Sequence, residues 1–204
     1  MKVFFLAVVR PQERGAAGEQ APSLILAEAS KLDSFSLFSR SSVQEFMRFF
    51  AATIAERTAV GQRQGVTEND YVGYVVRRHG QLAVVAVTDK DYPELAAMEL
   101  VGKAARAFEA RFEARQIAQA AAALPFEDAD ELLRQYQDPR QANAILKVQR
   151  ELEDTKAVLH KTMEGLLERE ERLDMLVDKS AHLSSQSKAF YKTAKKTNSC
   201  CIVM

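Results

Sequence analysis

The spacing of hydrophobic residues divides the chain into an amino-terminal part with mixed periodicities and a carboxy-terminal part with a single repeat. In the first part, short apolar runs rich in β-branched and aromatic residues are bounded by polar or turn residues, which is typical of strands. Four runs fit this description: residues 2–10, 23–29, 71–78 and 81–88. A fifth strand near residues 62–67 has a weaker signal.

Two amphipathic helices accompany these strands. The first begins at Ser42-Val43-Gln44-Glu45, where Ser42 and Glu45 fit a capping box. Its apolar side chains recur at helical spacing and are expected to face the sheet: Val43, Phe46, Met47, Phe50 and Ile54. The second begins at Tyr92-Pro93, because proline is favoured in the first helical turn, and continues to Leu124-Pro125.

A short helix from Asp128 to Tyr136 follows, and Asp138-Pro139 marks a boundary. We assign residues 1–125 to a globular domain and residues 126–139 to a linker. The order of strands and helices predicts an α+β fold, in which the helices pack on an antiparallel sheet.

From Ile145 onward the chain has no strand signal, and its seam residues step alternately by three and four positions. This spacing predicts a coiled-coil helix over residues 140–199. The large apolar members of the seam are Ile145, Val148, Leu152, Leu159, Leu166, Leu173, Leu176, Leu183 and Phe190. Apolar residues also flank the seam, at Val158, Met163 and Val177, so we expect more than one partner helix. Hydroxylic seam residues and Gly165 weaken the isolated helix, which we therefore expect to be largely disordered without partners.

Arg169 places a cation in the middle of this apolar seam. A guanidinium that is buried without acceptors is strongly destabilising. Glutamine carboxamides on three neighbouring helices would satisfy it without a second buried charge. Alternatively, Arg169 lies on a helix surface and the heptad is misassigned, but Leu166, Leu173 and Leu176 fix the phase and favour the seam.

The last four residues of Cys200-Cys201-Ile202-Val203-Met204 form a prenylation box. The terminal methionine favours a farnesyl group on Cys201, and Cys200 is placed to carry a palmitoyl group or a second prenyl group. One prenyl chain anchors a protein only marginally. We expect the five lysines after Asp178, with no acidic residue among them, to add attraction to anionic lipids.

Composition argues against several other classes of protein. The net charge is +0, and the residues before position 179 are acidic on balance, which argues against a nucleic-acid surface. We see no catalytic or metal-binding constellation, so we expect neither an enzyme nor a metal, and no cofactor beyond the covalent lipids. No apolar run has the length of a membrane span. Residues 1–10 resemble a short signal sequence but lack a cleavage site, and fit a buried strand better.

Three segments carry a resemblance to a known family. Residues 166–174, Leu-Leu-Glu-Arg-Glu-Glu-Arg-Leu-Asp, resemble the central layer of an R-SNARE. Residues 1 to about 125 resemble a longin domain, most clearly over residues 35–47. Residues 187–194, followed by Asn198-Ser199-Cys200-Cys201, are similar to the longin R-SNAREs that end in a lipid box instead of a membrane span.

This resemblance implies a longin domain of profilin-like fold followed by an R-SNARE segment that pairs with three Q-SNARE helices to drive membrane fusion. Arg169 would face three glutamines. The protein would be cytoplasmic and peripheral on the cytosolic face of Golgi, endosomal, vacuolar and vesicle membranes. The alternative is a lipid-anchored coiled-coil tether or adaptor that does not itself drive fusion.

The resemblance also implies that the longin domain folds back on the SNARE segment, keeps it inactive and shields the prenyl group in an apolar groove. The expected docking face on the longin domain comprises Phe46, Phe49 and Phe50. Phe49 lies off the main apolar stripe of its helix, so the sequence allows either a core position or an exposed docking position.

Overall fold

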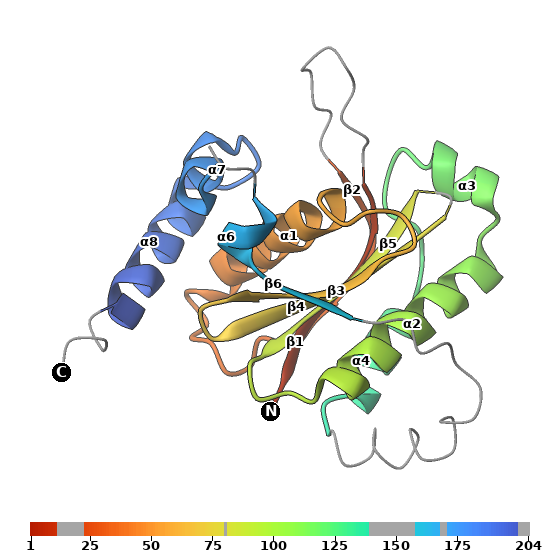
Figure 1. Ribbon diagram of the computed structural model, residues 1–204, viewed down its shortest axis with the longest axis horizontal. Helices are drawn as coiled ribbons and strands as arrows, with labels where there is room; N and C mark the ends of the chain where they lie inside the picture. The colour runs from red at the N-terminus through yellow and green to blue at the C-terminus, as the bar shows by residue number, and fades with distance from the viewer. Residues whose placement is uncertain (12–22, 80, 139–157, 168–170, 200–204) are drawn as a thin grey trace.

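The computed structural model describes residues 1–11, 23–79, 81–138, 158–167 and 171–199, with side chains as far as Lys195 (Figure 1). Six strands within these residues form one sheet in the order β2-β1-β5-β4-β3-β6. Their bounds are β1 Val3–Arg10, β2 Leu24–Ser30, β3 Arg63–Glu68, β4 Tyr71–Arg78, β5 Leu82–Asp89 and β6 Leu159–Thr162. Neighbours among the first five strands are antiparallel, as predicted, and the weak signal near residues 62–67 corresponds to β3.

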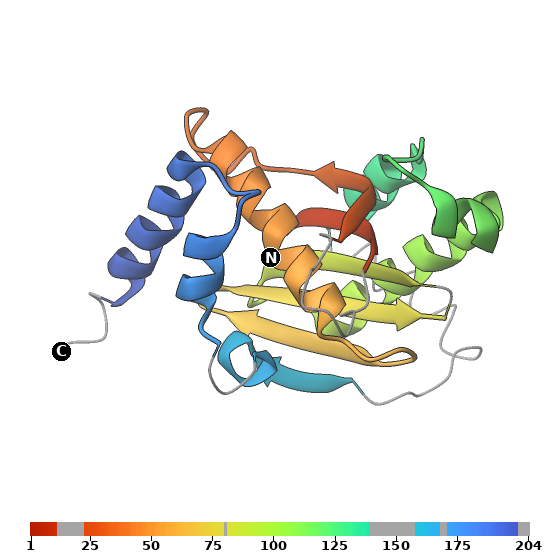
Figure 2. The same cartoon turned by 90° about the horizontal axis from the view of Figure 1, so that it is seen from above.

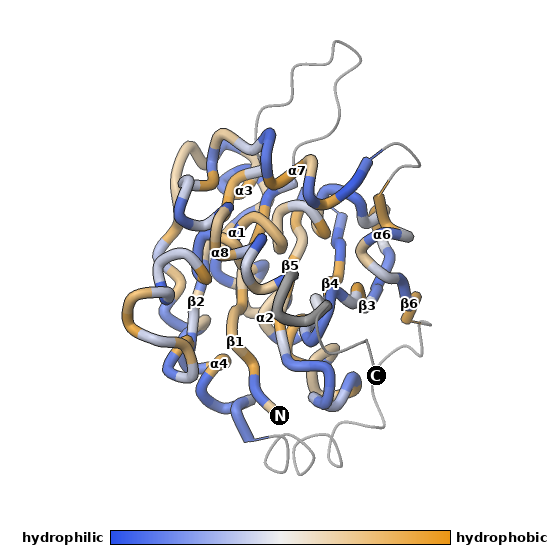
Figure 3. Tube along the Cα trace, turned by 90° about the vertical axis from the view of Figure 1, so that its left-hand side faces the viewer, coloured by the Kyte–Doolittle hydropathy of each residue, from blue (hydrophilic) through white to orange (hydrophobic). Residues whose placement is uncertain are grey.

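Helices cover both faces of the sheet. Helix α1 (Arg40–Glu56) lies on one face, and α2 (Glu94–Arg111) and α4 (Asp128–Gln135) lie on the other (Figures 1 and 2). Alternate residues of β1 therefore enter different cores: Leu6 packs with α2 and α4, and Phe5 packs with α1. A strand covered on both faces needs no polar side. This explains why β1 is an uninterrupted apolar run, coloured as hydrophobic in Figure 3.

Helix α1 approaches the sheet closely at Gly73 of β4. A Cβ atom at this position would lie 2.4 Å from Ile54 Cδ1 and 3.1 Å from a ring carbon of Phe50. Any larger residue would push these side chains aside in a close-packed interior. Gly73 therefore sets the separation between α1 and the sheet.

The predicted start of α1 is wrong. The helix begins at Arg40, and Ser39 occupies the N-cap position without a side-chain hydrogen bond. Ser42 is consequently a buried residue inside the helix, and no capping box forms there. Glu45 instead accepts hydrogen bonds from a distant part of the chain.

The predicted single helix over residues 93–124 is also wrong. Helix α2 ends at Arg111 because Phe112 adopts an extended backbone conformation, and a separate helix, α3, covers Ala114–Gln119. Arg10 donates to three carbonyl oxygens at the end of α3, at 2.7, 2.8 and 3.1 Å. A cation at this position satisfies carbonyl groups that have no partner within the helix.

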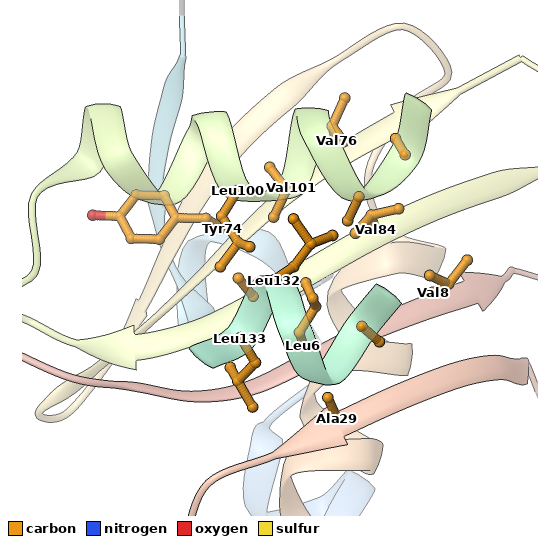
Figure 4. Packing of buried hydrophobic residues seen from close by; sticks show 14 of the residues in the cluster. Leu6, Val8, Ala29, Tyr74, Val76, Val84, Leu100, Val101, Leu132 and Leu133 are labelled. Carbon is orange, nitrogen blue, oxygen red and sulfur yellow. The ribbon is translucent and has the colours of Figure 1, made fainter. Parts of the chain in front are cut away.

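Residues 126–138, which we predicted to be part of a linker, belong to the globular domain. Their apolar side chains are buried in the core between α2, α4 and the sheet: Phe126, Ala129, Leu132, Leu133 and Tyr136. Figure 4 shows Leu132 and Leu133 in this core. The Gln137 side chain also donates to the carbonyl oxygen of Val3 at 2.6 Å. The linker prediction failed because the sequence did not indicate which face of the sheet needed another helix.

Replacing Leu132 with alanine tests this boundary. Leu132 is buried, so Leu132→Ala should lower the free energy of unfolding by about 2–4 kcal/mol, measured by urea titration. Arg134→Ala, an exposed change on the same helix, should alter it by less than about 0.5 kcal/mol. Equal urea midpoints for the two variants would restore the linker assignment.

Candidate functional site

The C-terminal segment, residues 158–199, folds back beside α1 and the edge of the sheet (Figures 1 and 2). It contains β6, α6 (Met163–Leu166), α7 (Leu173–Lys179) and α8 (Ser185–Ser199). β6 extends the sheet by pairing in parallel with β3, from Gln64↔Leu159 to Thr67↔Thr162. All four side chains of β6 are exposed, so this pairing depends mainly on backbone hydrogen bonds.

The predicted continuous helix is therefore wrong for this arrangement of the chain. Leu159–Thr162 is a strand, and α7 and α8 are separated at residues 180–184. The expectation that this segment is largely disordered without partners is also wrong for its described residues. The globular domain supplies the apolar cover that the sequence led us to expect only from other helices.

The described seam residues differ in their burial. Leu166, Leu173 and Leu183 are buried in the core on the α1 side of the sheet, and Leu176 and Phe190 are partly buried against it. The flanking residues Met163 and Val177 are fully buried in the same core, whereas Leu159 is 42% exposed. The remaining predicted seam residues, Ile145, Val148 and Leu152, lie outside the described residues, as does Arg169.

The predicted docking face contributes three side chains of α1 to this core. Phe50 is buried, and Phe46 and Phe49 are partly buried against the core. The ring of Phe46 stacks on Tyr191 of α8 with 5.1 Å between centroids and 20° between planes. Phe49 is therefore neither a fully buried core residue nor an isolated exposed one.

Glu45 joins α1 to the start of α8. Its carboxylate accepts hydrogen bonds from the Ser187 hydroxyl at 2.6 Å and from the Ser184 backbone N–H at 3.0 Å. The Ser187 bond is the main cause of a lowered Glu45 pKa, and the Ser184 bond adds to it. Because Ser187 is fully buried, its hydroxyl depends on this partner and on Ser184.

Asp174 joins α7 to α8. It accepts from the Tyr191 hydroxyl at 3.0 Å and pairs with Lys195 at 2.6 Å. The hydrogen bond from Lys195 is the main cause of a lowered Asp174 pKa. Burial, followed by the bond to Asp174, raises the pKa of Tyr191, so its hydroxyl stays protonated and acts as a donor.

Arg57, which follows the last residue of α1, pairs with Glu171 at 3.0 Å. The Arg57 side chain is 13% exposed and also contacts Glu56 at 3.6 Å. Glu171 is two positions after Arg169 in the sequence, so this pair attaches the C-terminal segment to the domain on the C-terminal side of Arg169. The contacts of α1 with the C-terminal segment thus extend from Glu45 to Arg57, just beyond its last residue.

A small apolar groove lies between the globular domain and α8. Its main lining residues are Phe35, Phe46, Met47, Tyr71, Phe190 and Ala194. Its volume of about 50 Å³ is less than the ~150 Å³ of a cavity that holds benzene. A 15-carbon chain would therefore fit only if α8 moved outward.

Three of the lysines near the end of the chain have acidic or carbonyl partners in this arrangement. Lys192 pairs with Asp178 at 2.8 Å, Lys188 donates to the Asp178 carbonyl at 2.8 Å, and Lys195 pairs with Asp174. The lipidation candidates Cys200 and Cys201 lie outside the described residues.

The described residues contain no group of histidine, cysteine and carboxylate side chains that could hold a metal ion. Among the helices we describe, none combines the length and apolar character that a membrane span needs.

Comparisons with known proteins identify both parts of the chain. Residues 32–133 match the family model for a longin "Regulated-SNARE-like domain", and residues 144–202 match the family model named "Synaptobrevin". The chain is 46% identical over 207 residues to the synaptobrevin homolog YKT6 of Candida glabrata and 45% identical over 207 residues to that of Saccharomyces cerevisiae. It is 44% identical over 203 residues to the Schizosaccharomyces pombe homolog. Each comparison covers 100% of both chains.

A longin domain followed by a synaptobrevin segment defines the class of longin-domain R-SNAREs, which act in vesicle trafficking and are not enzymes. The chain belongs to the YKT6 family of synaptobrevin homologues. The resemblance of the sequence to this class, and the predicted α+β longin fold, are therefore confirmed. Family membership implies SNARE partners and association with membranes.

Sequence reasoning missed the polar contacts that join the two parts of the chain. Glu45 and Ser187 are 142 positions apart, and Arg57 and Glu171 are 114 positions apart. Neither pair has a local pattern that predicts the contact. The nearest signal was Glu45 itself, an acidic residue beside the apolar stripe of α1, which we interpreted as a cap.

Replacing Glu45 with glutamine should weaken the attachment of α8 to α1. Loss of a charge-assisted hydrogen bond in this partly exposed position corresponds to about 1 kcal/mol, or about fivefold faster hydrogen exchange in α8. Because the folded arrangement lowers the Glu45 pKa, its contribution is complete above the ordinary value of 4.5 and is lost as the pH falls through the lowered pKa. Glu45→Gln should remove this acid dependence. The control, Ser41→Ala, should keep it. Unchanged hydrogen exchange in Glu45→Gln would contradict the assigned bond.

Exchanging the charges of Arg57 and Glu171 tests the second contact. Arg57→Glu should place two carboxylates together and increase exchange in α6 and α7, by an amount that corresponds to about 1–3 kcal/mol. Adding Glu171→Arg in the same chain should restore most of the protection, because the pair is re-formed with opposite polarity. A double variant that exchanges as fast as Arg57→Glu would exclude a direct pair.

Proposed function

We propose that this R-SNARE pairs with three Q-SNARE helices and drives membrane fusion in the secretory, Golgi and endosomal-vacuolar pathways. The proposal rests on the position of Arg169 between Leu166 and Leu173 in the heptad seam. A guanidinium at this position requires neutral oxygen acceptors when water is excluded, and three glutamine carboxamides supply them. Its membranes would be those of the Golgi, endosomes, vacuole and transport vesicles, on their cytosolic side.

We also propose that the folded-back arrangement is an autoinhibited resting state. The proposal rests on one observation: the side chains that are buried against the globular domain are those that partner helices would need to contact. Met163, Leu166, Leu173 and Val177 are buried against the globular domain and would also be needed to bind partner helices. Leu159–Thr162 cannot be a strand on β3 and a turn of a SNARE helix at the same time. Pairing with Q-SNAREs therefore requires this segment to leave the domain.

We further propose a lipid anchor in which Cys201 carries a farnesyl group and Cys200 carries a palmitoyl group. The lipid box in the sequence supports this assignment. The apolar groove beside Phe46 and Phe190 offers partial shelter for a prenyl chain in the resting state, provided that α8 moves outward. The tail lysines would then be free to meet anionic headgroups once they leave Asp174 and Asp178.

The role of Arg169 is tested by mixing the full chain with candidate sets of three Q-SNARE helices. Arg169→Ala should lower the thermal stability of the four-helix complex and slow lipid mixing between vesicles that carry the two sides. Arg172→Ala is the matched control, because Arg172 lies off the seam and is exposed in the resting state. We expect the control to resemble the unchanged chain.

Two results would contradict the fusion proposal. The first is equal complex stability for Arg169→Ala and Arg172→Ala, which would place the guanidinium in water. The second is a chain that self-associates through residues 140–199 and clusters vesicles without lipid mixing, which would support the tether function.

A further inference from the structure

Two large apolar side chains project from the loop between β2 and α1. Leu37 is 75% exposed and Phe38 is 99% exposed. Every other phenylalanine and tyrosine in the described residues is buried or partly buried. Two adjacent exposed apolar side chains of this size, in a domain whose other aromatic side chains are at least partly buried, indicate a contact with a protein or a membrane.

Hydrogen bonds fix the conformation of the loop that carries these side chains. Arg40 donates to the carbonyl oxygens of Phe35 at 3.2 Å and Asp33 at 3.3 Å. The Ser39 backbone N–H donates to the Ser36 carbonyl oxygen at 3.0 Å, and their hydroxyls are 2.9 Å apart. The turn therefore presents Leu37 and Phe38 outward at little further conformational cost.

The loop lies on the same side of the domain as α8. In Figure 1 it precedes α1 at the end of the domain that faces α8. Phe35 lines the same groove as Phe190, Ala194 and Lys195 of α8, the last two of which belong to its C-terminal half. Helix α8 ends at Ser199, two positions before Cys201 in the sequence. A bilayer that holds a lipid on Cys201 would therefore come close to this loop.

We propose that Leu37 and Phe38 insert into the bilayer to which the lipidated C-terminus is anchored, so that the globular domain has its own contact with the membrane. The geometry rests on the proposed lipid anchor, which brings the bilayer to this side of the domain. The charged residues in and beside the loop are the exposed Lys31, the partly exposed Arg40 and the exposed Asp33, whose carboxylate lies 4.0 Å from Arg40. Two cations and one anion leave a net charge of +1, which suits anionic headgroups. An aromatic and an aliphatic side chain next to cationic residues match the composition of interfacial membrane contacts. This local charge favours a bilayer over an apolar protein groove as the occupant.

The composition of the chain makes this inference directly testable. The chain contains no tryptophan, so Phe38→Trp introduces a single tryptophan that can be excited selectively, and its two cysteines are Cys200 and Cys201. Coupling these thiols to a maleimide lipid attaches the full chain to vesicles at the proposed anchor. The attachment does not depend on whether a cell prenylates it, so the loop is tested separately from the anchor.

On vesicles that contain phosphatidylserine, the emission of Phe38→Trp should shift to shorter wavelength and be quenched by brominated acyl chains. Leu95→Trp is the control, since Leu95 is 51% exposed and belongs to α2 on the other face of the sheet. Its emission should not change. Emission from Phe38→Trp that stays water-like, or equal quenching at both positions, would overturn the proposal. So would a shift that appears only when Q-SNARE helices are added, because the loop would then be a protein-binding surface.

A second measurement does not introduce tryptophan. The Cys200→Ser chain, coupled through Cys201 to a single acyl chain, should bind vesicles only marginally. Adding Leu37→Ser and Phe38→Ser should lower its partition to vesicles about tenfold, because two apolar side chains no longer leave water. An unchanged partition would contradict the proposed insertion.

Discussion

The proposed resting and fusing states would compete for one set of apolar side chains in the C-terminal segment. Met163, Leu166, Leu173 and Val177 lose their contact with water against α1 and the sheet. Each such side chain contributes about 1.5–3 kcal/mol when fully buried, so the segment needs an apolar cover of some kind. Partner helices could offer a similar cover, and the same side chains cannot use both. The proposed resting and fusing states are therefore alternatives in a strict physical sense.

The polar contacts decide which register the segment adopts on the globular domain. Apolar burial is not directional, whereas the polar contacts of Glu45, Arg57 and Asp174 form only in particular geometries. Each contact is individually modest, because ordinary hydrogen bonds contribute about 0.5–1.5 kcal/mol and bonds to charged groups about 1.5–3 kcal/mol. Together they specify one arrangement of the segment on the globular domain. A competing partner of ordinary affinity could still displace the segment.

The β6 strand is the part of the segment in which local and tertiary preferences conflict. Its residues lie in a heptad pattern that predicts a helix, yet they extend the sheet with all four side chains exposed. Its backbone groups are satisfied by β3, and its side chains bury little surface. A strand held in this way has low local stability and is expected to open before the better-buried α6 and α7. Opening at this edge would release Leu159–Thr162, which immediately precede α6.

The longin-type strands and the family could be read from the sequence alone, because they depend on local periodicity and on motifs such as residues 166–174. The resemblance also implied a docking face at Phe46, Phe49 and Phe50, and these side chains lie in or against the core that contains the C-terminal segment. Only the tertiary structure decided that Glu45 binds Ser184 and Ser187, that Arg57 binds Glu171, and that residues 126–138 complete the core. The physical reason is the range of each interaction: helical and strand patterns repeat within a few residues, whereas these contacts join positions that become neighbours only when the chain folds.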